Sequence, residues 1–530
     1  MPKKPFRFWP ARRCRIKISK YSVGDSPVVQ FAGRRITKYG IALLVIVLLG
    51  LVLRVYDLAA QSFWWDEAFS AIVSTQALPV IVSRSSADVH PPLYYFLLHY
   101  WMNLFGTSDF AIRFLSVIFG VSAIPMIYVL GRRLFDDEVG IVSALILATS
   151  FFNIKYSQEA RMYSLMVLLA LLSMYFFVRF LEKNTVLTSF GYVLATTLLV
   201  YSHVLGVLML VAQNVYVVTV LLVSKKRTFR VLNWIILEAT VIALFTPWIP
   251  MVVSSAHRAV KPALQINTFT ETLTAYAGSP QLLWLFVVLT VLSLFTFAKI
   301  RGPANWREPA KALESYSWEV RITNLKSLYL LAVWLLTFNI IPYVISHLSN
   351  YHIYLSKYVI AASTALYVIV ATGIRNINYN YAKLAVVGVI LVLSASSVQS
   401  YYLNPTKSDA RDVMSYIDGN AKRGDLVLVY SGDTDALIFN WYNNRTDLTA
   451  KDFPANYVNL WSKSTEQNIQ ELNSDVAGHD RVWIINSTTQ PDHTFNLVKA
   501  LYQKTLNASY ATTDSKSYLG YDVQLYEKRA

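Results

Sequence analysis

The chain has 530 residues, of which 55% are hydrophobic and only 15% are charged. Such a composition excludes an ordinary soluble enzyme and indicates an integral membrane protein. The formal net charge of +16 does not indicate nucleic-acid binding, because the basic residues gather in short clusters between apolar runs, as membrane topology requires. With one cysteine, Cys14, the chain can form neither an intramolecular disulfide nor a metal site built from cysteines.

Residues 1–38 form a basic segment that precedes the first apolar run. No small-residue cleavage site closes that run, so we expect an uncleaved first membrane span and not a signal peptide. The basic segment is predicted to be cytoplasmic.

Apolar runs follow along the chain at regular intervals. A bilayer core of about 30 Å requires roughly 20 apolar residues per helix. By that test about eleven runs are predicted to be transmembrane helices. They are residues 39–56, 111–130, 139–154, 163–181, 187–203, 204–223, 231–253, 281–299, 326–346, 357–374 and 383–400.

The basic clusters in the short connections predict the orientation, because Lys and Arg in such loops stay on the cytoplasmic side. The clusters at 34–38, 132–133, 225–230 and 301–311 fall on one face if all runs cross the membrane. The loops around residues 66, 159, 203 and 352 then share the non-cytoplasmic face. An odd number of spans places the end of the chain on that face as well.

Two segments differ from the spans. Residues 57–110 are too long for a turn and rich in aromatic residues, so we expect one or two short interfacial helices on the outer leaflet. From residue 405 polar residues increase, and helices near 409–418, 436–442 and 495–502 alternate with strands at 426–430, 482–485 and 521–526. The sequence thus predicts a membrane domain, 39–404, and a small soluble α/β domain, 405–530.

The first outer loop carries an acidic pair, Asp66 and Glu67, flanked by Trp64 and Trp65. A carboxylate at a membrane interface is a candidate general base for an acceptor hydroxyl. A helix N-cap or an exposed acidic pair is an equally good interpretation of these two residues. Further along the loop, Asp88, His90 and Tyr94 surround two prolines that indicate a helix start. Asp88 and His90 could bind a sugar, a metal or a phosphate.

Two further outer loops combine charged and aromatic residues. One holds Glu159, Arg161 and Tyr163, where Arg161 either binds a phosphate or pairs with the neighbouring acid. The other holds Lys357 and Tyr358, where the lysine either meets a charged partner or extends to the interface. Asp88, His90 and Glu159 could assemble a divalent metal site, but no ligand spacing requires one, so no metal ligand and no certain cofactor is predicted.

These motifs resemble those of the GT-C superfamily of glycosyltransferases that use polyprenyl-phosphate sugars, in particular protein O-mannosyltransferases and the lipid A aminoarabinose transferase. The resemblance covers roughly residues 40 to 400. It rests on Arg54, Trp65-Asp66-Glu67-Ala68, His90-Pro91-Pro92-Leu93-Tyr94, Arg113-Phe114-Leu115-Ser116, Ser157-Gln158-Glu159-Ala160-Arg161-Met162-Tyr163 and Ser356-Lys357-Tyr358.

The resemblance implies a GT-C fold and a catalytic role for Asp66, with Glu67 in support. The family often has Arg-Tyr where this chain has Lys357-Tyr358, so a phosphate contact by Lys357 lacks the bidentate fork of arginine. The implied partners are the lipid bilayer, a polyprenyl-phosphate-linked sugar donor and a lipid, glycan or protein acceptor. A single base without a second nucleophile favours inversion at the sugar.

Two other classes of protein fit some of these features. A secondary transporter would also have about eleven spans, but we detect no inverted repeat, and the ionisable residues lie in loops instead of mid-span. A structural or sensory membrane protein would use the α/β domain to bind a ligand, yet that domain shows no evident catalytic set of residues.

Overall fold

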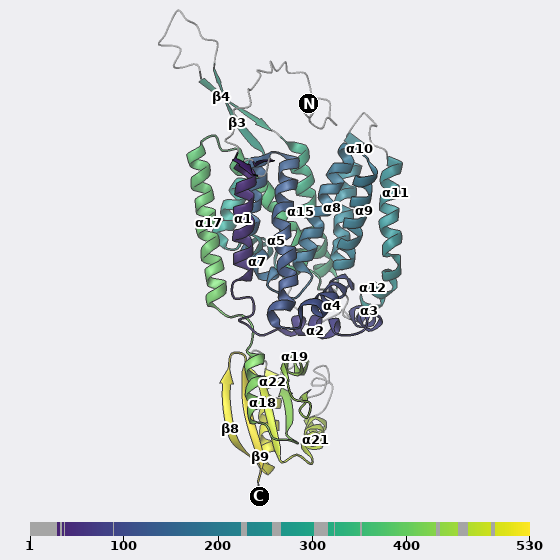
Figure 1. Ribbon diagram of the computed structural model, residues 1–530, viewed down its shortest axis with the longest axis vertical. Coiled ribbons are helices and arrows are strands. Elements are labelled where there is room, and N and C mark those ends of the chain that lie inside the picture. Colours follow the sequence, from purple (N-terminus) through teal and green to yellow (C-terminus); the bar gives the residue numbers. More distant parts are fainter. Residues whose placement is uncertain are drawn as a thin grey trace, which may run out of the picture. The chain divides into compact units, whose positions relative to one another are not determined.

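The computed structural model of the protein describes residues 29–31, 34–36, 38–87, 90–223, 231–256, 267–301, 316–322, 324–349, 352–430, 435–453, 465–488 and 493–529 (Figure 1). Of the predicted basic segment 1–38, only two short strands and Lys38 are among these residues. The chain forms two compact units. The first consists of Met1–Tyr56, Leu78–Leu97 and Phe114–Ser400, and the second of Asp57–Ala77, Leu98–Arg113 and Tyr401–Ala530.

The first unit is helical. Its helices are α1 (Lys38–Val55), α3 (Leu78–Ala87), α4 (Leu93–Phe105), α5 (Asp109–Leu134), α6 (Asp137–Thr149), α7 (Phe151–Ser157), α8 (Tyr163–Glu182), α9 (Val186–Ser202), η1 (Val204–Gly206), α10 (Val207–Val223), α11 (Val231–Phe245), η2 (Thr246–Trp248), α12 (Ile249–Ala256), α13 (Phe269–Ala277), α14 (Pro280–Ser293), α15 (Leu325–Leu348), η3 (Ser356–Val359), α16 (Ala361–Arg375) and α17 (Asn380–Leu403). The unit boundaries cut through α4, α5 and α17. Two antiparallel hairpins join β1 (Val29–Phe31) to β2 (Arg34–Ile36) and β3 (Phe295–Arg301) to β4 (Tyr316–Ile322).

Among the described residues, seven helices are long and apolar enough to cross a membrane, or up to nine if each of two bent pairs is one span. The bent pairs are α6 with α7, at 59°, and α13 with α14, at 91°. Two shorter apolar helices, α9 and α16, occupy two further predicted runs. Each predicted run therefore contains an apolar helix or a bent pair of helices, which confirms a multi-pass membrane protein.

One predicted run extends too far. The run 281–299 was expected to be helical throughout, but α14 ends at Ser293 and β3 begins at Phe295. The aromatic and β-branched residues there pair with β4 in an antiparallel register that joins Phe295 to Ile322. Apolar composition alone does not distinguish such a strand from the end of a helix.

Helix α16 lies at the centre of the first unit. All residues from Ala361 to Ile374 are buried, and the helix packs against α6, α14 and α15. At Gly373 a Cβ atom would lie 2.0 Å from the backbone oxygen of Leu289 in α14, so the close approach of these two helices requires glycine. By contrast, only 17% of the apolar window of α1 is buried in protein, as expected of a helix that faces lipid.

Helices α8, α9 and α11 lie side by side in the first unit (Figure 1). A polar cluster joins them to α10: the Tyr192 hydroxyl donates to Glu238 Oε1 at 2.5 Å, and its oxygen lies 2.9 Å from Gln213 Oε1. Asn214 Nδ2 donates to the other oxygen of Glu238 at 2.6 Å. Hydrogen bonds of this kind hold apolar helices together where water is absent.

Arg54 stabilises the break between α6 and α7. Its guanidinium is fully buried and donates to the carbonyl oxygens of Ala148, at 3.0 Å, and Leu147, at 3.1 Å. Because α6 ends at Thr149, carbonyl groups of its last turn lack helical partners and accept from this cation instead. Just beyond α7, Gln158 Nε2 donates to the Arg54 carbonyl at 3.1 Å. Arg54 therefore holds the loop that leads to Arg161.

The second unit contains a five-stranded sheet with the strand order β6-β5-β7-β9-β8. Its strands are β5 (Leu426–Tyr430), β6 (Ala450–Asp452), β7 (Arg481–Ser487), β8 (Tyr510–Tyr518) and β9 (Tyr521–Lys528), and its C-terminal helices are α18 (Ala410–Asn420), α19 (Ala436–Tyr442), α21 (Thr465–Val476) and α22 (His493–Ser509). Strand β5 is parallel to β6 and β7, whereas β9 is antiparallel to β7 and β8. This architecture confirms the small C-terminal α/β fold.

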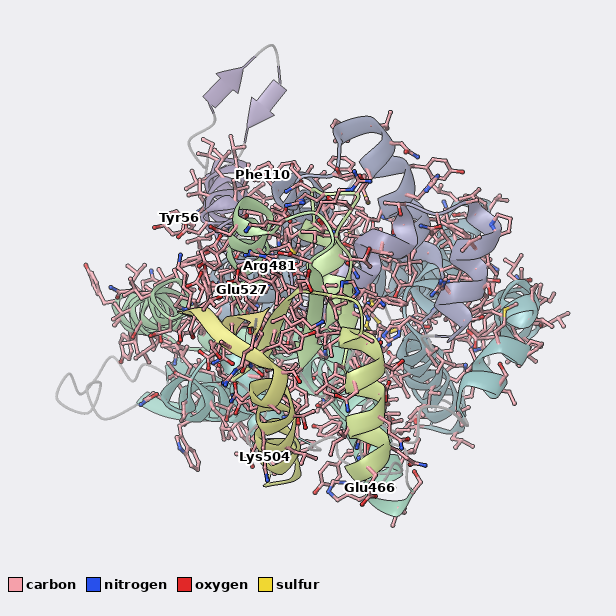
Figure 2. The ribbon with its side chains drawn as sticks, turned by 90° about the horizontal axis from the view of Figure 1, so that it is seen from below. Tyr56, Phe110, Glu466, Arg481, Lys504 and Glu527 are labelled. Carbon is pink, nitrogen blue, oxygen red and sulfur yellow. The ribbon has the colours of Figure 1, made fainter. Side chains whose placement is uncertain are left out.

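The sheet is held by an apolar core and an ion-pair cluster. Every residue of β5 is buried, as in parallel strands that are covered on both faces. Arg481 of β7 pairs with Asp425, with 3.1 Å between Nε and Oδ1, and with Glu527 of β9, beside which it lies in Figure 2. The sequence had indicated three strands here; β6 and β8 are additional.

The first outer loop also differs from the prediction. One or two short helices were expected between residues 57 and 110, but this stretch contains three: α2 (Trp65–Ser74), α3 and α4. Helix α2 belongs to the second compact unit together with the C-terminal residues from Tyr401 onward.

Candidate active site

Helix α2 presents the acidic pair. Trp64 is the N-cap in an extended conformation, so Asp66 and Glu67 both lie in the first turn and neither of them is the cap. The positive end of a helix dipole stabilises negative charge at this position. Asp66 is partly exposed, and its backbone oxygen accepts a hydrogen bond from Ser70 Oγ at 2.8 Å.

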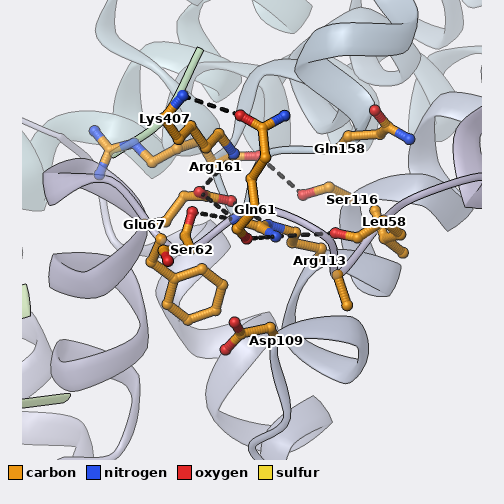
Figure 3. Close-up of polar contacts among 12 residues, drawn as sticks. Leu58, Gln61, Ser62, Glu67, Asp109, Arg113, Ser116, Gln158, Arg161 and Lys407 are labelled. Carbon is orange, nitrogen blue, oxygen red and sulfur yellow. Dashed lines mark hydrogen bonds and ion pairs between the residues drawn. The ribbon is translucent and has the colours of Figure 1, made fainter. Parts of the chain in front are cut away.

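Glu67 is held by two cations. Arg113 donates to both of its carboxylate oxygens, from Nε to Oε1 at 2.8 Å and from Nη2 to Oε2 at 2.9 Å (Figure 3). Lys407 Nζ donates to Oε2 at 2.7 Å. The Glu67 side chain is 0% exposed and that of Lys407 is 9% exposed. Burial alone would raise the pKa of Glu67, but the ion pairs with Arg113 and Lys407 outweigh it and lower the pKa to about 2.

Arg113 also fixes the chain that leads into α2. Its Nη1 donates to the carbonyl oxygens of Leu58, at 2.9 Å, and Gln61, at 2.7 Å, and its Nη2 donates to that of Ser62 at 2.9 Å. The guanidinium lies over the ring of Phe63, 4.9 Å from its centroid. Arg113 thus bonds to the loop backbone and to Glu67 at the same time, and it defines where α2 begins.

In the first unit, Arg161 lies in the loop between α7 and α8 and is 2% exposed. Its Nη1 donates to the Tyr95 hydroxyl at 3.2 Å, and its Nη2 lies 3.4 Å from His90 Nε2. The Arg161 carbonyl oxygen accepts from Ser116 Oγ at 3.1 Å, and that hydroxyl is 2.8 Å from the Tyr94 hydroxyl. Tyr95 therefore contacts the guanidinium, and Tyr94 supports Arg161 through Ser116; both tyrosines are fully buried.

Lys357 and two histidine rings lie in the same unit. Lys357 Nζ is 5.8 Å from the ring centroid of Tyr163 and 5.5 Å from that of Tyr358, so the ammonium faces two tyrosines. The Tyr358 ring is 5.2 Å from that of His203 and 6.2 Å from that of His90. Aromatic rings whose centroids lie this close pack directly against each other. His90, His203, Lys357, Tyr163 and Tyr358 therefore form one cluster.

His203 occupies the turn between α9 and η1 and is 5% exposed. Its Nδ1 accepts from the backbone N–H of Leu205 at 3.1 Å, which leaves the proton of the neutral ring on Nε2. Burial, His90, Arg161 and Lys357 all lower the pKa of His203 well below its usual value. A neutral imidazole can lie beside two cations without repulsion.

The remaining predicted site residues are placed as follows. Asp88 lies outside the described residues. Glu159 is buried at the turn that precedes α8, and its carbonyl accepts from the Arg161 backbone N–H at 2.7 Å. In the part of the chain that the structure describes, no group of three or more His, Cys, Asp and Glu residues could hold a metal ion.

Sequence reasoning assigned no role to Lys407, Tyr95 or the contacts of Arg113. Lys407 lies 340 residues from Glu67, and no pattern in the sequence links the two. Arg113 was recognised only as part of a motif. Its position four residues after Asp109, at the start of an apolar run, is the one signal that could have indicated a buried cation with a partner.

Solved structures share this fold. The structure of ArnT from Cupriavidus metallidurans bound to undecaprenyl phosphate has a TM-score of 0.57 at 11% identity, and the similarity covers 91% of this chain and 97% of that one. The oligosaccharyltransferase AglB from Archaeoglobus fulgidus, in complex with an inhibitory peptide and a dolichol-phosphate, has a TM-score of 0.55 at 12% identity, covering 91% of this chain and 74% of that one.

These similarities define a multi-pass membrane protein with the fold of ArnT and AglB. A family profile described as dolichyl-phosphate-mannose-protein mannosyltransferase matches residues 89–251. No curated protein sequence matches the chain significantly. The family match and the shared fold both agree with the resemblance to GT-C glycosyltransferases that rests on the motifs.

Proposed function

We propose that the protein transfers a sugar, a hexose or a pentose, from a polyprenyl-phosphate donor to a lipid, glycan or protein acceptor on the non-cytoplasmic face of the membrane, with Asp66 as general base. The proposal rests on the different environments of Asp66 and Glu67. Asp66 is partly exposed in the first turn of α2, whereas both carboxylate oxygens of Glu67 are occupied by Arg113 and Lys407. Of the two acids, Asp66 is the one that an acceptor can reach.

The chemistry follows from a single displacement. Asp66 accepts the proton of an acceptor hydroxyl or amine as that group attacks the anomeric carbon of the sugar. A bond from the acceptor to the anomeric carbon forms, the bond from that carbon to the phosphate oxygen breaks, and the electron pair leaves with the phosphate. Attack opposite to the leaving group inverts the configuration of the sugar.

Arg161 and Lys357 are proposed to stabilise the negative charge on the leaving phosphate. The hydrogen bond to Tyr95 orients the guanidinium of Arg161, and the rings of Tyr163 and Tyr358 face the ammonium of Lys357. His90 and these two tyrosines would line the site for the phosphate and the sugar. Undecaprenyl phosphate and dolichol-phosphate, the ligands named for the ArnT and AglB structures, are of the same chemical class.

The remaining predicted residues receive supporting roles. Glu67 would hold α2 in place and not exchange protons with the acceptor, because its low pKa keeps it ionised. Tyr94 would position Arg161 through Ser116, and Glu159 would shape the same loop. Asp88, two positions before His90 in the sequence, stays in the proposal as a substrate-binding residue.

We further propose the topology that the basic clusters predict. The N-terminal segment, 1–38, would be cytoplasmic, the membrane domain 39–404 would carry the catalytic residues, and the α/β domain 405–530 would be non-cytoplasmic. A polyprenyl donor remains in the bilayer because of its tail, which explains why the enzyme is built from membrane helices.

The test is sugar transfer by purified full-length protein in detergent, with a panel of labelled polyprenyl-phosphate sugars. Asp66→Asn should abolish transfer while expression and membrane insertion stay at the wild-type level. Asp57→Asn is the matched control, because it makes the same chemical change in the same loop and Asn tolerates the left-handed backbone of that position, where φ is 53°. Retained transfer in the Asp66 variant would show that the base is wrong, and a protein that moves no sugar from any donor would contradict the class of reaction.

A further inference from the structure

The residues just before α18 and in its first turn bond closely to the chain that leads into α2. The backbone N–H groups of Thr406 and Lys407 both donate to Gln61 Oε1 at 2.9 Å. The backbone N–H of Arg411 donates to Ser62 Oγ at 3.1 Å. The Arg411 guanidinium donates to the carbonyl oxygens of Ala59, at 3.1 Å, and Ala60, at 2.9 Å. The loop from 59 to 62 is thus bonded to the start of the C-terminal region, which we define as Tyr401–Ala530. The bonds involve the backbone of Ala59 and Ala60 and the side chains of Gln61 and Ser62.

Helix α19 of the same region makes a second set of contacts. The Tyr442 hydroxyl accepts from the Phe63 backbone N–H at 2.7 Å and donates to Asp109 Oδ2 at 2.9 Å. Asp109 also pairs with Arg411, with 3.2 Å between Oδ2 and Nη1. The centroid of the Phe63 ring lies 6.0 Å from the ring centroids of Trp441 and Tyr442. Side chains from two parts of the C-terminal region therefore surround the residues immediately before Asp66.

Lys407 is the contact that reaches α2 itself. Its ammonium lies 2.7 Å from Glu67 Oε2, and Glu67 directly follows Asp66 in the first turn of the helix. Glu67 and Arg113 already form a bidentate pair, so their charges balance without Lys407. Lys407 is thus a second buried cation on the Glu67 carboxylate, and it is supplied by the C-terminal region.

We propose that Lys407 is a positioning residue for Asp66: it binds Glu67 and so ties the first turn of α2 to the C-terminal region. This inference rests on the proposed function of Asp66. Catalytic groups must hold their geometry closely, and a displacement of about 1 Å can cost about 100-fold in rate. The C-terminal region is then part of the catalytic apparatus.

The test compares full-length Lys407→Met with Lys407→Arg, and with Lys422→Met as the matched control, because Lys422 is exposed in the same compact unit. Lys407→Met keeps the apolar length and removes the charge, and it leaves the Glu67–Arg113 pair intact, so the protein should fold. We expect its kcat to fall about 10-fold to 100-fold while the KM for the donor stays unchanged. Lys407→Arg should recover most of the rate, and Lys422→Met should behave as wild type.

Hydrogen exchange provides the readout that does not depend on catalysis. Peptides that cover α2, Trp65–Ser74, should exchange faster in Lys407→Met than in wild type, while peptides from α8 should not change. With Asp66→Asn inactive in the same preparation, unchanged kcat or unchanged α2 exchange in Lys407→Met would overturn this inference alone. An active Asp66→Asn variant would instead overturn the proposed function, and the α2 exchange would still decide whether Lys407 holds the helix.

Discussion

The buried carboxylate of Glu67 should make the stability of the protein depend on pH in acid. Burial alone raises the pKa of Glu67, but Arg113 and Lys407 lower it from 4.5 to about 2. A carboxyl group whose pKa is lowered by folding stabilises the folded state above its unfolded pKa, and the contribution is lost as the pH falls through the folded pKa. This shift corresponds to about 3 kcal/mol, fully present near pH 7 and lost mainly between about pH 4.5 and about pH 2.

Glu67→Gln removes this contribution and leaves two cations buried around a neutral amide. Breaking a buried ion pair from one side typically costs about 3–5 kcal/mol. The assay heats detergent-solubilised protein and follows the monomer peak in size-exclusion chromatography, from about pH 7 to about pH 3. We expect a large decrease in the midpoint temperature of Glu67→Gln at neutral pH. The gap to wild type should narrow in acid, where about 2 kcal/mol of the wild-type contribution is lost by about pH 3.

The matched control is Glu466→Gln, an exposed carboxylate in α21 of the same compact unit. It should follow the wild-type curve at every pH. A gap between Glu67→Gln and wild type that is the same at both ends of the pH range would refute the assigned linkage, and no gap at neutral pH would refute the ion pairs themselves.

Four further substitutions, with one control, test the first unit. Arg161→Lys keeps the charge but loses the planar fork, so the rate of sugar transfer should fall about 10-fold to 100-fold. Lys357→Arg should stay active, because arginine supplies the same charge. Steady-state transfer rates with one labelled donor test both predictions. Gly373→Val should lower the midpoint temperature by overpacking α14 against α16, at a cost of about 1–3 kcal/mol, while Gly388→Ala, which adds a Cβ in open space, should not. Arg54→Met leaves carbonyl groups at the end of α6 without their donor and should cost about 1–3 kcal/mol, and a midpoint equal to that of wild type would contradict this role.

Much of the fold could be predicted because each membrane helix corresponds to an apolar run that is long enough to cross a bilayer. The break between α6 and α7 could not, since Ser150 interrupts the helix in the middle of an apolar run and hydropathy does not report the backbone angle. The end of α14 was missed for a related reason: apolar residues continue past Ser293 into the first residues of β3, so hydropathy does not mark where the helix stops.

The candidate site was predictable in its residue types but not in its partners. Adjacent residues of a helix point about 100° apart, so the sequence did not reveal that the Tyr95 hydroxyl accepts a hydrogen bond from Arg161. The different environments of Asp66 and Glu67 were equally hidden, because the pairing of Glu67 with Lys407 depends on how the chain folds over a separation of 340 residues.

The separation of 340 residues between Glu67 and Lys407 also determines when their contact can form during synthesis of the chain. Domains generally fold from the N-terminus as the chain is synthesised, so Glu67 and Arg113 can meet early, within the first helices to be inserted. Lys407, Arg411 and Tyr442 emerge only after the membrane helices have been made. The loop that holds Asp66 therefore receives its last contacts at the end of synthesis, and an unfinished chain would carry the acid without the contacts that fix it.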